Sequence, residues 1–275
     1  MPFTTRNGVR IHFQTEGNGP SLLLHAGAVG DGESWRLAGY VRALRPDFHL
    51  ILMDPRGRGK SDRPRGPGAH RIEEYREDVR SVLDELHRDR AVLVGASDGS
   101  KVCAAFAEKY PERVAALIDI DGLEPRDLTD PDSRDRASRL ELAQAARKGE
   151  FPALFRQYAK DSGYTGPESV IENLATTDPE MIALDMEAWR EWEGPASVLR
   201  RLEVPVLLLQ AEKSYSTEER EAMARMNPRS EVRVIPDVGH VVACLTPDLV
   251  VPHLRSFLSK LRDARLTQGE RVGAA

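Results

Sequence analysis

The sequence predicts an α/β protein with a mostly parallel central sheet, helices on both faces and a helical insertion before the last strands. Three observations lead to this fold class. Short runs of leucine and β-branched residues alternate with amphipathic stretches. The runs are almost continuously apolar, as expected for parallel strands covered on both faces. Between residues 123 and 196 the alternation stops, with no convincing strand, and it then resumes.

Five strands are expected before the insertion. The first alternates apolar and polar residues like an edge hairpin strand, and the others are typical of buried strands. They are "VRIHFQTEG" (9–17), "SLLLHAG" (21–27), "HLILMD" (49–54), "RAVLVGAS" (90–97) and "VAALIDID" (114–121). Helical spacing predicts helices between these strands, at 35–47, 72–87 and 98–113.

The insertion is expected to be a lid rather than a second domain. Residues 1–122 and 197–275 would form the core, and residues 123–196 a helical cap. After the cap, the pattern predicts two strands and two helices, at 204–212, 217–226, 231–240 and 247–264. The cap is rich in aromatic residues, some of which are expected to line an apolar pocket: Phe151, Phe155, Tyr158, Trp189 and Trp192.

Composition excludes several classes of function. The net charge of −5 is spread along 275 residues without a basic stripe, so nucleic acid is not an expected partner. No apolar leader and no run of 18 apolar residues occur, which predicts a cytoplasmic protein that does not enter a membrane. Two cysteines cannot form a disulfide scaffold, and no metal-ligand spacing is present. We expect no metal and no cofactor, a small-molecule substrate, and a monomer or homodimer.

The segment "VLVGASDGS" contains the pattern G-x-S-x-G centred on Ser97. The pattern closes a predicted strand and opens a predicted helix, which is the setting that a nucleophile elbow requires. A sharp turn that exposes the serine hydroxyl leaves no room for Cβ atoms two residues to either side, which explains the glycines. Ser97 is therefore the candidate nucleophile.

A serine needs a neighbouring base to take its proton. Of the seven histidines, His240 stands apart because it follows the last predicted strand, in "VIPDVGH". A loop at that place reaches over the carboxyl edge of the sheet, where open α/β sheets collect their ligand sites. His240 is the candidate base.

At this point the chain resembles the α/β-hydrolase family over nearly its whole length. The matching motifs are "LLLHAGA", "DPRGRGKSDRP", the elbow "GASDG" and the final "GH" of Gly239 and His240. The predicted insertion falls where this family places its cap. The resemblance implies an oxyanion hole made by the backbone N–H of Asp98, which follows the nucleophile, and by an N–H in the "HAGA" loop, that of Gly27. Dehalogenases of the family are disfavoured, because their nucleophile is an aspartate.

Two interpretations of the Asp98 side chain remain open. A carboxylate in the first turn of a helix interacts favourably with the helix dipole and needs no other role. Alternatively, it could face the active-site cavity and favour a substrate with an amino group, since family members with S-D-G at the elbow include esterases that accept amino-acid esters.

The orienting acid is not at its usual place in this resemblance. In most of the family it follows the strand that here reads "VPVLLLQAE", and an ungapped alignment puts Ser214 there. Glu212 lies in the same loop, two residues earlier. Asp121 ends an earlier strand, where some family members carry their acid, and the order Ser97, Asp121, His240 matches nucleophile, acid and base. Asp121 is the preferred candidate, Glu212 the alternative, and a dyad without an acid is a third option.

The sequence thus predicts a serine hydrolase that cleaves a small, partly apolar ester, thioester, lactone or amide through an acyl-enzyme on Ser97. Two alternatives stay open. One is a lyase, cyclase or cofactor-free oxygenase on the same fold, in which His240 is an acid/base and Ser97 only binds. The other is a non-catalytic protein that binds a ligand under the cap.

Overall fold

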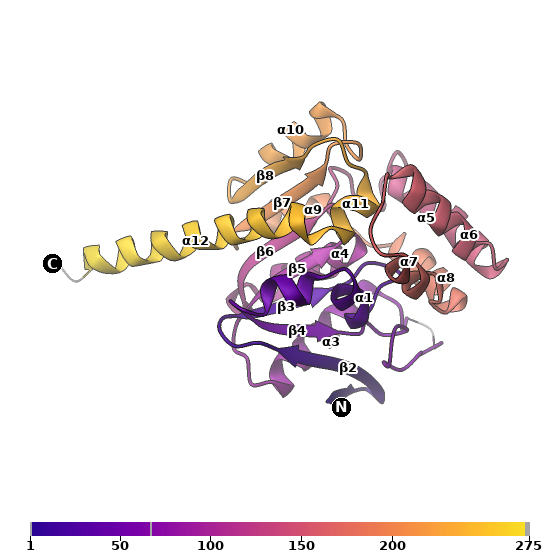
Figure 1. Cartoon of the computed structure of the whole chain (residues 1–275), viewed down its shortest axis with the longest axis horizontal. Coiled ribbons are helices and arrows are strands. Elements are labelled where there is room, and N and C mark those ends of the chain that lie inside the picture. Colours follow the sequence, from indigo (N-terminus) through magenta and orange to yellow (C-terminus); the bar gives the residue numbers. More distant parts are fainter. Residues whose placement is uncertain (1, 67, 273–275) are drawn as a thin grey trace.

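A computed structural model describes residues 2–66 and 68–272, with side chains up to residue 262. The described residues form one sheet in the order β1-β2-β4-β3-β5-β6-β7-β8 (Figure 1). The pairs β1–β2 and β2–β4 are antiparallel, and all later neighbours are parallel. The strands are β1 (Phe3–Arg6), β2 (Val9–Glu16), β3 (Ser21–His25), β4 (His49–Met53), β5 (Ala91–Ala96), β6 (Val114–Ile120), β7 (Val206–Ala211) and β8 (Ser230–Ile235).

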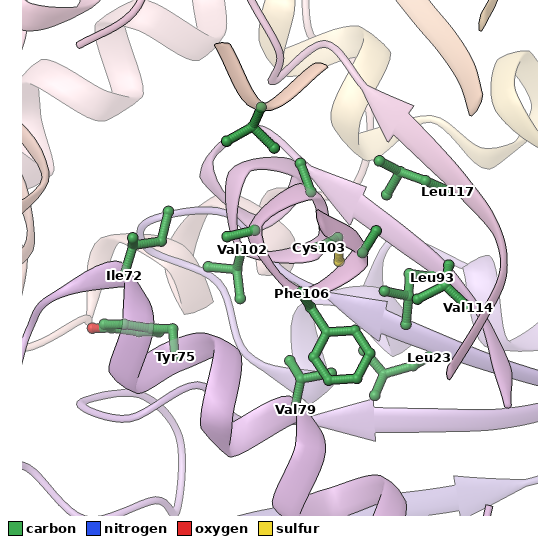
Figure 2. Close-up of a cluster of buried hydrophobic side chains, with 14 of the residues drawn as sticks. Leu23, Ile72, Tyr75, Val79, Leu93, Val102, Cys103, Phe106, Val114 and Leu117 are labelled. Carbon is green, nitrogen blue, oxygen red and sulfur yellow. The ribbon is translucent and has the colours of Figure 1, made fainter. Parts of the chain in front are cut away.

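Helices cover both faces of this sheet, because adjacent strand residues point to opposite sides. In β3, Leu23 packs on one face, and Leu22 and Leu24 pack on the other. The Leu23 face is covered by α3 (Ile72–Glu85) and α4 (Asp98–Lys109), as Figure 2 shows, and also by α9 (Ala196–Arg201) and α10 (Thr217–Met226). The opposite face is covered by α1 (Gly32–Leu37), α2 (Tyr40–Leu44), α11 (His240–Leu245) and α12 (Pro247–Val272).

The single helix predicted at 35–47 is wrong. The chain forms α1 and α2 instead, separated by Gly39, whose φ of 96° lies in the left-handed region that only glycine adopts without strain. Of the four residues that the spacing placed on one face, Trp35, Val41 and Leu44 pack in the same buried cluster, whereas Leu37 is half-buried and outside it. The break was missed because glycine costs only about 1 kcal/mol inside a helix, so spacing alone does not locate it.

The insertion between β6 and β7 is helical, as predicted. It contains α5 (Arg134–Arg147), α6 (Phe151–Asp161), α7 (Glu168–Ala175) and α8 (Pro179–Trp189), which group together at one side of the sheet (Figure 1). A small cluster of buried apolar residues joins α5, α6 and α8, and it also contacts Ala28 and Val29 in the loop after β3. The insertion is therefore packed onto the loop that follows β3.

Among the described residues, no helix combines the length and the apolar character that crossing a bilayer would require.

Candidate active site

Ser97 lies in the sharp turn between β5 and α4. Its φ of 53° and ψ of −127° are unusual for a residue with a side chain, and such backbone strain clusters at functional sites. The two motif glycines are required for space. A Cβ on Gly95 would lie 2.4 Å from the Cα of Ser100, and one on Gly99 would lie 2.2 Å from the carbonyl oxygen of His25. The turn is a nucleophile elbow.

Three predicted residues meet in one chain of hydrogen bonds. The Oγ of Ser97 lies 2.9 Å from His240 Nε2, and His240 Nδ1 lies 2.8 Å from Asp121 Oδ2. The side chain of Asp121 is fully buried, whereas that of His240 is 25% exposed. The imidazole therefore joins a buried carboxylate to a hydroxyl at the edge of the site.

Asp121 is held from the neighbouring strand. It follows β6 with a left-handed φ of 54°, and its Oδ1 accepts a 2.7 Å hydrogen bond from the backbone N–H of Ala211, at the end of β7. Its Oδ2 accepts a second bond, 2.6 Å long, from the hydroxyl of Ser214. These two donors fix the orientation of the carboxylate. Ser214, at the position where most of the family carries its acid, therefore donates a hydrogen bond to the acid Asp121.

Glu212 is not part of this chain of hydrogen bonds. It is exposed, and its Oε2 accepts from the backbone N–H of Asp237 at 2.8 Å. Asp119, two residues before Asp121 on β6, is also separate: its Oδ1 accepts the N–H groups of Gly122 and Leu123. Burial raises the pKa of Asp119 to about 7.

The surroundings of His240 determine its basicity. Burial disfavours the imidazolium, but the neighbouring Cys244 and the carboxylate of Asp121 favour it, and the pKa of His240 is raised well above its ordinary value. The ring of Tyr158, on α6 of the insertion, stacks against the imidazole with centroids 6.2 Å apart. The insertion thus covers one side of the histidine.

The two candidate oxyanion donors lie next to Ser97. Asp98 opens α4, so its N–H belongs to the first turn, whose N–H groups have no partner within the helix. Gly27 is adjacent, because a Cβ built on it would lie 3.0 Å from Ser97 Cβ and 3.6 Å from Ser97 Oγ. A side chain on residue 27 would crowd the nucleophile.

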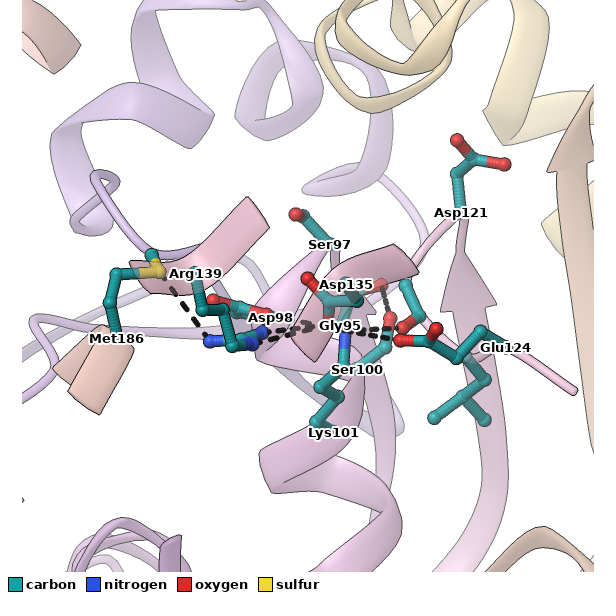
Figure 3. Close-up of polar contacts among 12 residues, drawn as sticks. Gly95, Ser97, Asp98, Ser100, Lys101, Asp121, Glu124, Asp135, Arg139 and Met186 are labelled. Atoms are coloured by element: carbon teal, nitrogen blue, oxygen red, sulfur yellow. Dashed lines mark hydrogen bonds and ion pairs between the residues drawn. The ribbon is translucent and has the colours of Figure 1, made fainter. Parts of the chain in front are cut away.

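The Asp98 side chain belongs to a buried network of charges. Its Oδ1 pairs with Arg139 from α5 and lies 3.3 Å from Lys101 Nζ. Arg139 also binds Asp135, 3.0 Å away, and Lys101 also contacts Asp135 and Glu124. Figure 3 shows the network beside Ser97 and apart from Asp121. Burial raises the pKa of Asp98, but the two cations outweigh burial and lower it below its usual range.

The charges of this network largely offset one another. Two cations face the carboxylates of Asp98 and Asp135, and burial raises the pKa of Glu124 to about 8, which favours its neutral form. The carboxylate of Asp98 is therefore already paired, which removes the support for its binding a substrate amino group.

Several contributors were missed at the sequence level. Gly122 has to be glycine because a Cβ there would lie 1.9 Å from the carbonyl oxygen of Ser97, and "DG" after a strand is the signal that could have indicated it. Arg139 was not named from the sequence. Tyr158 and Ser214 were named, but their contacts with His240 and Asp121 were not foreseen, since they join distant segments. No local pattern marks such contacts.

Fold and site together define an α/β protein with an elbow serine, a histidine after the last strand and a buried carboxylate between them. The sequence profile of the alpha/beta hydrolase fold matches residues 20–244, and the chain belongs to that family. This confirms the resemblance and the fold class.

Individual relatives are distant. A 2-(acetamidomethylene)succinate hydrolase of Mesorhizobium japonicum is 25% identical over 91% of this chain and 92% of its own length. A Bacillus subtilis (strain 168) protein named as a 2-succinyl-6-hydroxy-2,4-cyclohexadiene-1-carboxylate synthase is 25% identical over 94% of this chain and 98% of its own. Among solved structures, a thermophilic esterase from Thermogutta terrifontis superposes with a TM-score of 0.77 at 28% identity, covering 94% and 97% of the two chains.

Proposed function

We propose that this protein is a serine hydrolase that cleaves a small, partly apolar ester, thioester, lactone or amide. The observation that carries the proposal is the hydrogen-bond chain from Ser97 through His240 to Asp121, with distances of 2.9 and 2.8 Å. Nucleophile, base and orienting acid are recognised by this geometry rather than by their positions in a sequence.

In the proposed mechanism, His240 removes the proton of Ser97 as the hydroxyl attacks the substrate carbonyl. Asp121 holds the imidazole in the required tautomer and stabilises the imidazolium. The N–H groups of Gly27 and Asp98 stabilise the oxyanion, and each such donor contributes about 2.7–4 kcal/mol to lowering the barrier. His240 then protonates the leaving group, and water, activated by the same histidine, releases the acyl group.

The preference for a partly apolar substrate rests on the surroundings of the site. Beside the loop of Gly27, the insertion packs a buried apolar cluster, Phe151, Ile182, Ala183 and Met186, against Ala28 and Val29. The nearby charges of Asp98, Asp135, Lys101 and Arg139 balance one another. The esterase similar in structure and the succinate-derivative hydrolase similar in sequence agree with hydrolysis.

The proposal is tested with a fluorophosphonate probe and a panel of 4-nitrophenyl esters and acyl lactones of increasing chain length. We expect one adduct, on Ser97, and no turnover after Ser97→Ala. The short and medium acyl chains should react fastest. An unlabelled Ser97, together with activity that survives Ser97→Ala, would exclude the acyl-enzyme.

A second candidate, elimination or cyclisation with His240 as acid/base, is kept because one full-length relative is named as a synthase. It predicts that Ser97→Ala reduces turnover only partly, whereas His240→Ala abolishes it. Comparing these two variants on one substrate separates the candidates.

A further inference from the structure

The loop after β3, residues 26–31, is held in place by side chains from outside the loop. Inside it, the N–H of Gly30 donates to the carbonyl of Gly27 at 3.1 Å and closes a tight turn. The next two carbonyls are bound by other segments. The carbonyl of Ala28 accepts from Arg58 Nε at 2.6 Å, and that of Val29 accepts from the hydroxyl of Thr177 at 2.7 Å.

Arg58 is in turn fixed by the insertion. Its Nη2 lies 2.5 Å from Asp185 Oδ2 on α8, and both side chains are at most 4% exposed. The other oxygen, Oδ1, accepts from the hydroxyl of Tyr75 and lies 2.5 Å from His70 Nδ1. Both carboxylate oxygens of Asp185 therefore have hydrogen-bond partners, which fix the orientation of the Arg58–Asp185 ion pair.

We infer that the helical insertion positions the oxyanion loop, through Asp185 acting on Arg58 and, independently, through Thr177. The inference rests on the proposed function, because it assigns these residues to the placement of the Gly27 N–H. Asp185, Arg58 and Thr177 are positioning residues, since they act through the loop.

The chemistry of Arg58 explains why an arginine is needed. The Nε and Nη2 donors of a guanidinium point in fixed, separate directions, so one side chain can hold a carbonyl and a carboxylate simultaneously. Lysine carries all its donors on one nitrogen and lacks this fixed fork of two separate donor nitrogens. The effect on rate is large, because a misplacement of about 1 Å at a catalytic group can cost on the order of 100-fold.

The test compares Asp185→Asn and Thr177→Val with Glu187→Gln. Glu187 lies on the same helix as Asp185 and pairs with Arg147 in an exposed ion pair, so its variant controls for loss of a carboxylate from α8. Thr177→Val removes one hydroxyl and keeps the shape of the side chain, so it guards against a folding defect in Asp185→Asn.

Hydrogen–deuterium exchange of residues 26–31 is the first readout, and it does not depend on activity. We expect faster exchange in both Asp185→Asn and Thr177→Val, and wild-type exchange in Glu187→Gln, with each variant folded by circular dichroism. If exchange of this loop is the same in all four proteins, the inference is wrong.

Pre-steady-state hydrolysis of 4-nitrophenyl acetate is the second readout. Acylation and deacylation both pass through an oxyanion, so both rates should fall by the same factor, about 10- to 100-fold in Asp185→Asn. KM should stay within about twofold of wild type. The midpoint of the pH–rate profile should stay within about 0.3 pH units, roughly the scatter of such measurements, because His240 is held by Asp121. Arg58→Lys should not restore the rate. A rise in KM with unchanged acylation and deacylation rates would instead mean that Asp185 shapes the substrate pocket, and would overturn the inference.

The two failures are distinguishable. If wild-type protein neither reacts with the fluorophosphonate nor hydrolyses the ester, the proposed function fails, while loop exchange still decides whether the insertion holds residues 26–31. If wild type is active and Asp185→Asn is equally fast, only the inference fails.

Discussion

The hydroxyl of Ser214 donates a 2.6 Å hydrogen bond to Asp121 Oδ2, the same oxygen that lies 2.8 Å from His240 Nδ1. The strands that precede these residues, β6 and β7, are parallel neighbours, with Ile120 opposite Leu209. Their carboxyl ends therefore present adjacent side chains to one histidine. In this chain the carboxylate after β6 binds His240, and the hydroxyl after β7 binds that carboxylate.

Replacing Asp121 by Asn should reduce kcat by about 10³- to 10⁴-fold with little change in KM, because asparagine presents the wrong partner to the imidazole N–H and cannot stabilise the imidazolium. Glu212→Gln is the matched control and should stay within twofold of wild type, on the order expected for a surface change. Steady-state kinetics on one ester decides between them. A larger loss in Glu212→Gln would transfer the role to that residue.

Moving the acid to the neighbouring strand should partly restore activity. In the double variant Asp121→Asn, Ser214→Asp, the new carboxylate starts from a side chain whose Oγ already lies 2.6 Å from the native carboxylate oxygen. We expect about a 10-fold or greater recovery of kcat over Asp121→Asn alone, since a carboxylate again orients the base. Ser214→Asn in the Asp121→Asn background is the control. Equal activity of the two double variants would mean that a carboxylate at residue 214 cannot replace Asp121.

The activity of the enzyme should rise with pH through a midpoint above 6.5. His240 acts as a base only when neutral, and its pKa is raised because Cys244 and Asp121 together outweigh the effect of burial. Asp121→Asn removes one of these contributions and should lower the pKa. The pH profile of kcat/KM gives the wild-type value, and an NMR titration of the imidazole follows both proteins. An unchanged pKa in Asp121→Asn would contradict the assignment.

The buried network beside the elbow should contribute strongly to stability. Arg139→Met leaves the carboxylates of Asp98 and Asp135 without their main cation, and breaking a buried pair in this way costs about 3–5 kcal/mol of the free energy of unfolding. Arg147→Met breaks an exposed pair and should cost less than about 1 kcal/mol. Urea unfolding measures both. Equal losses would mean that the network is not strongly coupled.

Asp119 should make the protein less stable as pH rises. Burial raises its pKa to about 7, whereas an aspartate in the unfolded chain titrates near ~4. Between these two pKa values the folded state keeps a proton that the unfolded state has lost, so this contribution declines from about pH 4 to about pH 7. Asp119→Asn should flatten the pH dependence of the unfolding free energy in that range, from about pH 4 to about pH 7. Glu124 titrates in the same direction, so some slope should remain.

The parts of the fold that repeat locally were predictable. Strand and helix periodicity located the sheet, and the chemistry of a tight turn identified Ser97 from two glycines. The helix predicted across Gly39 failed because a left-handed glycine and a helical glycine look alike in a sequence. Asp121 could be preferred over Glu212 from the sequence, but only the folded structure shows that Asp121 reaches His240 and that Glu212 binds the backbone N–H of Asp237 instead.

By itself, the sequence located most of the strands and helices, the turn around Ser97 and the place of the insertion, since these depend on periodicity and on residues close together in the chain. It missed β1, the break at Gly39 and the short helix α11. Only the tertiary structure decided which side chains from distant segments contact one another. It placed Ser214 as a donor to Asp121, paired Asp98 with Arg139, and connected Asp185 through Arg58 to the loop of Gly27. These contacts join segments 30 to 127 residues apart, and packing, not local preference, brings such segments together.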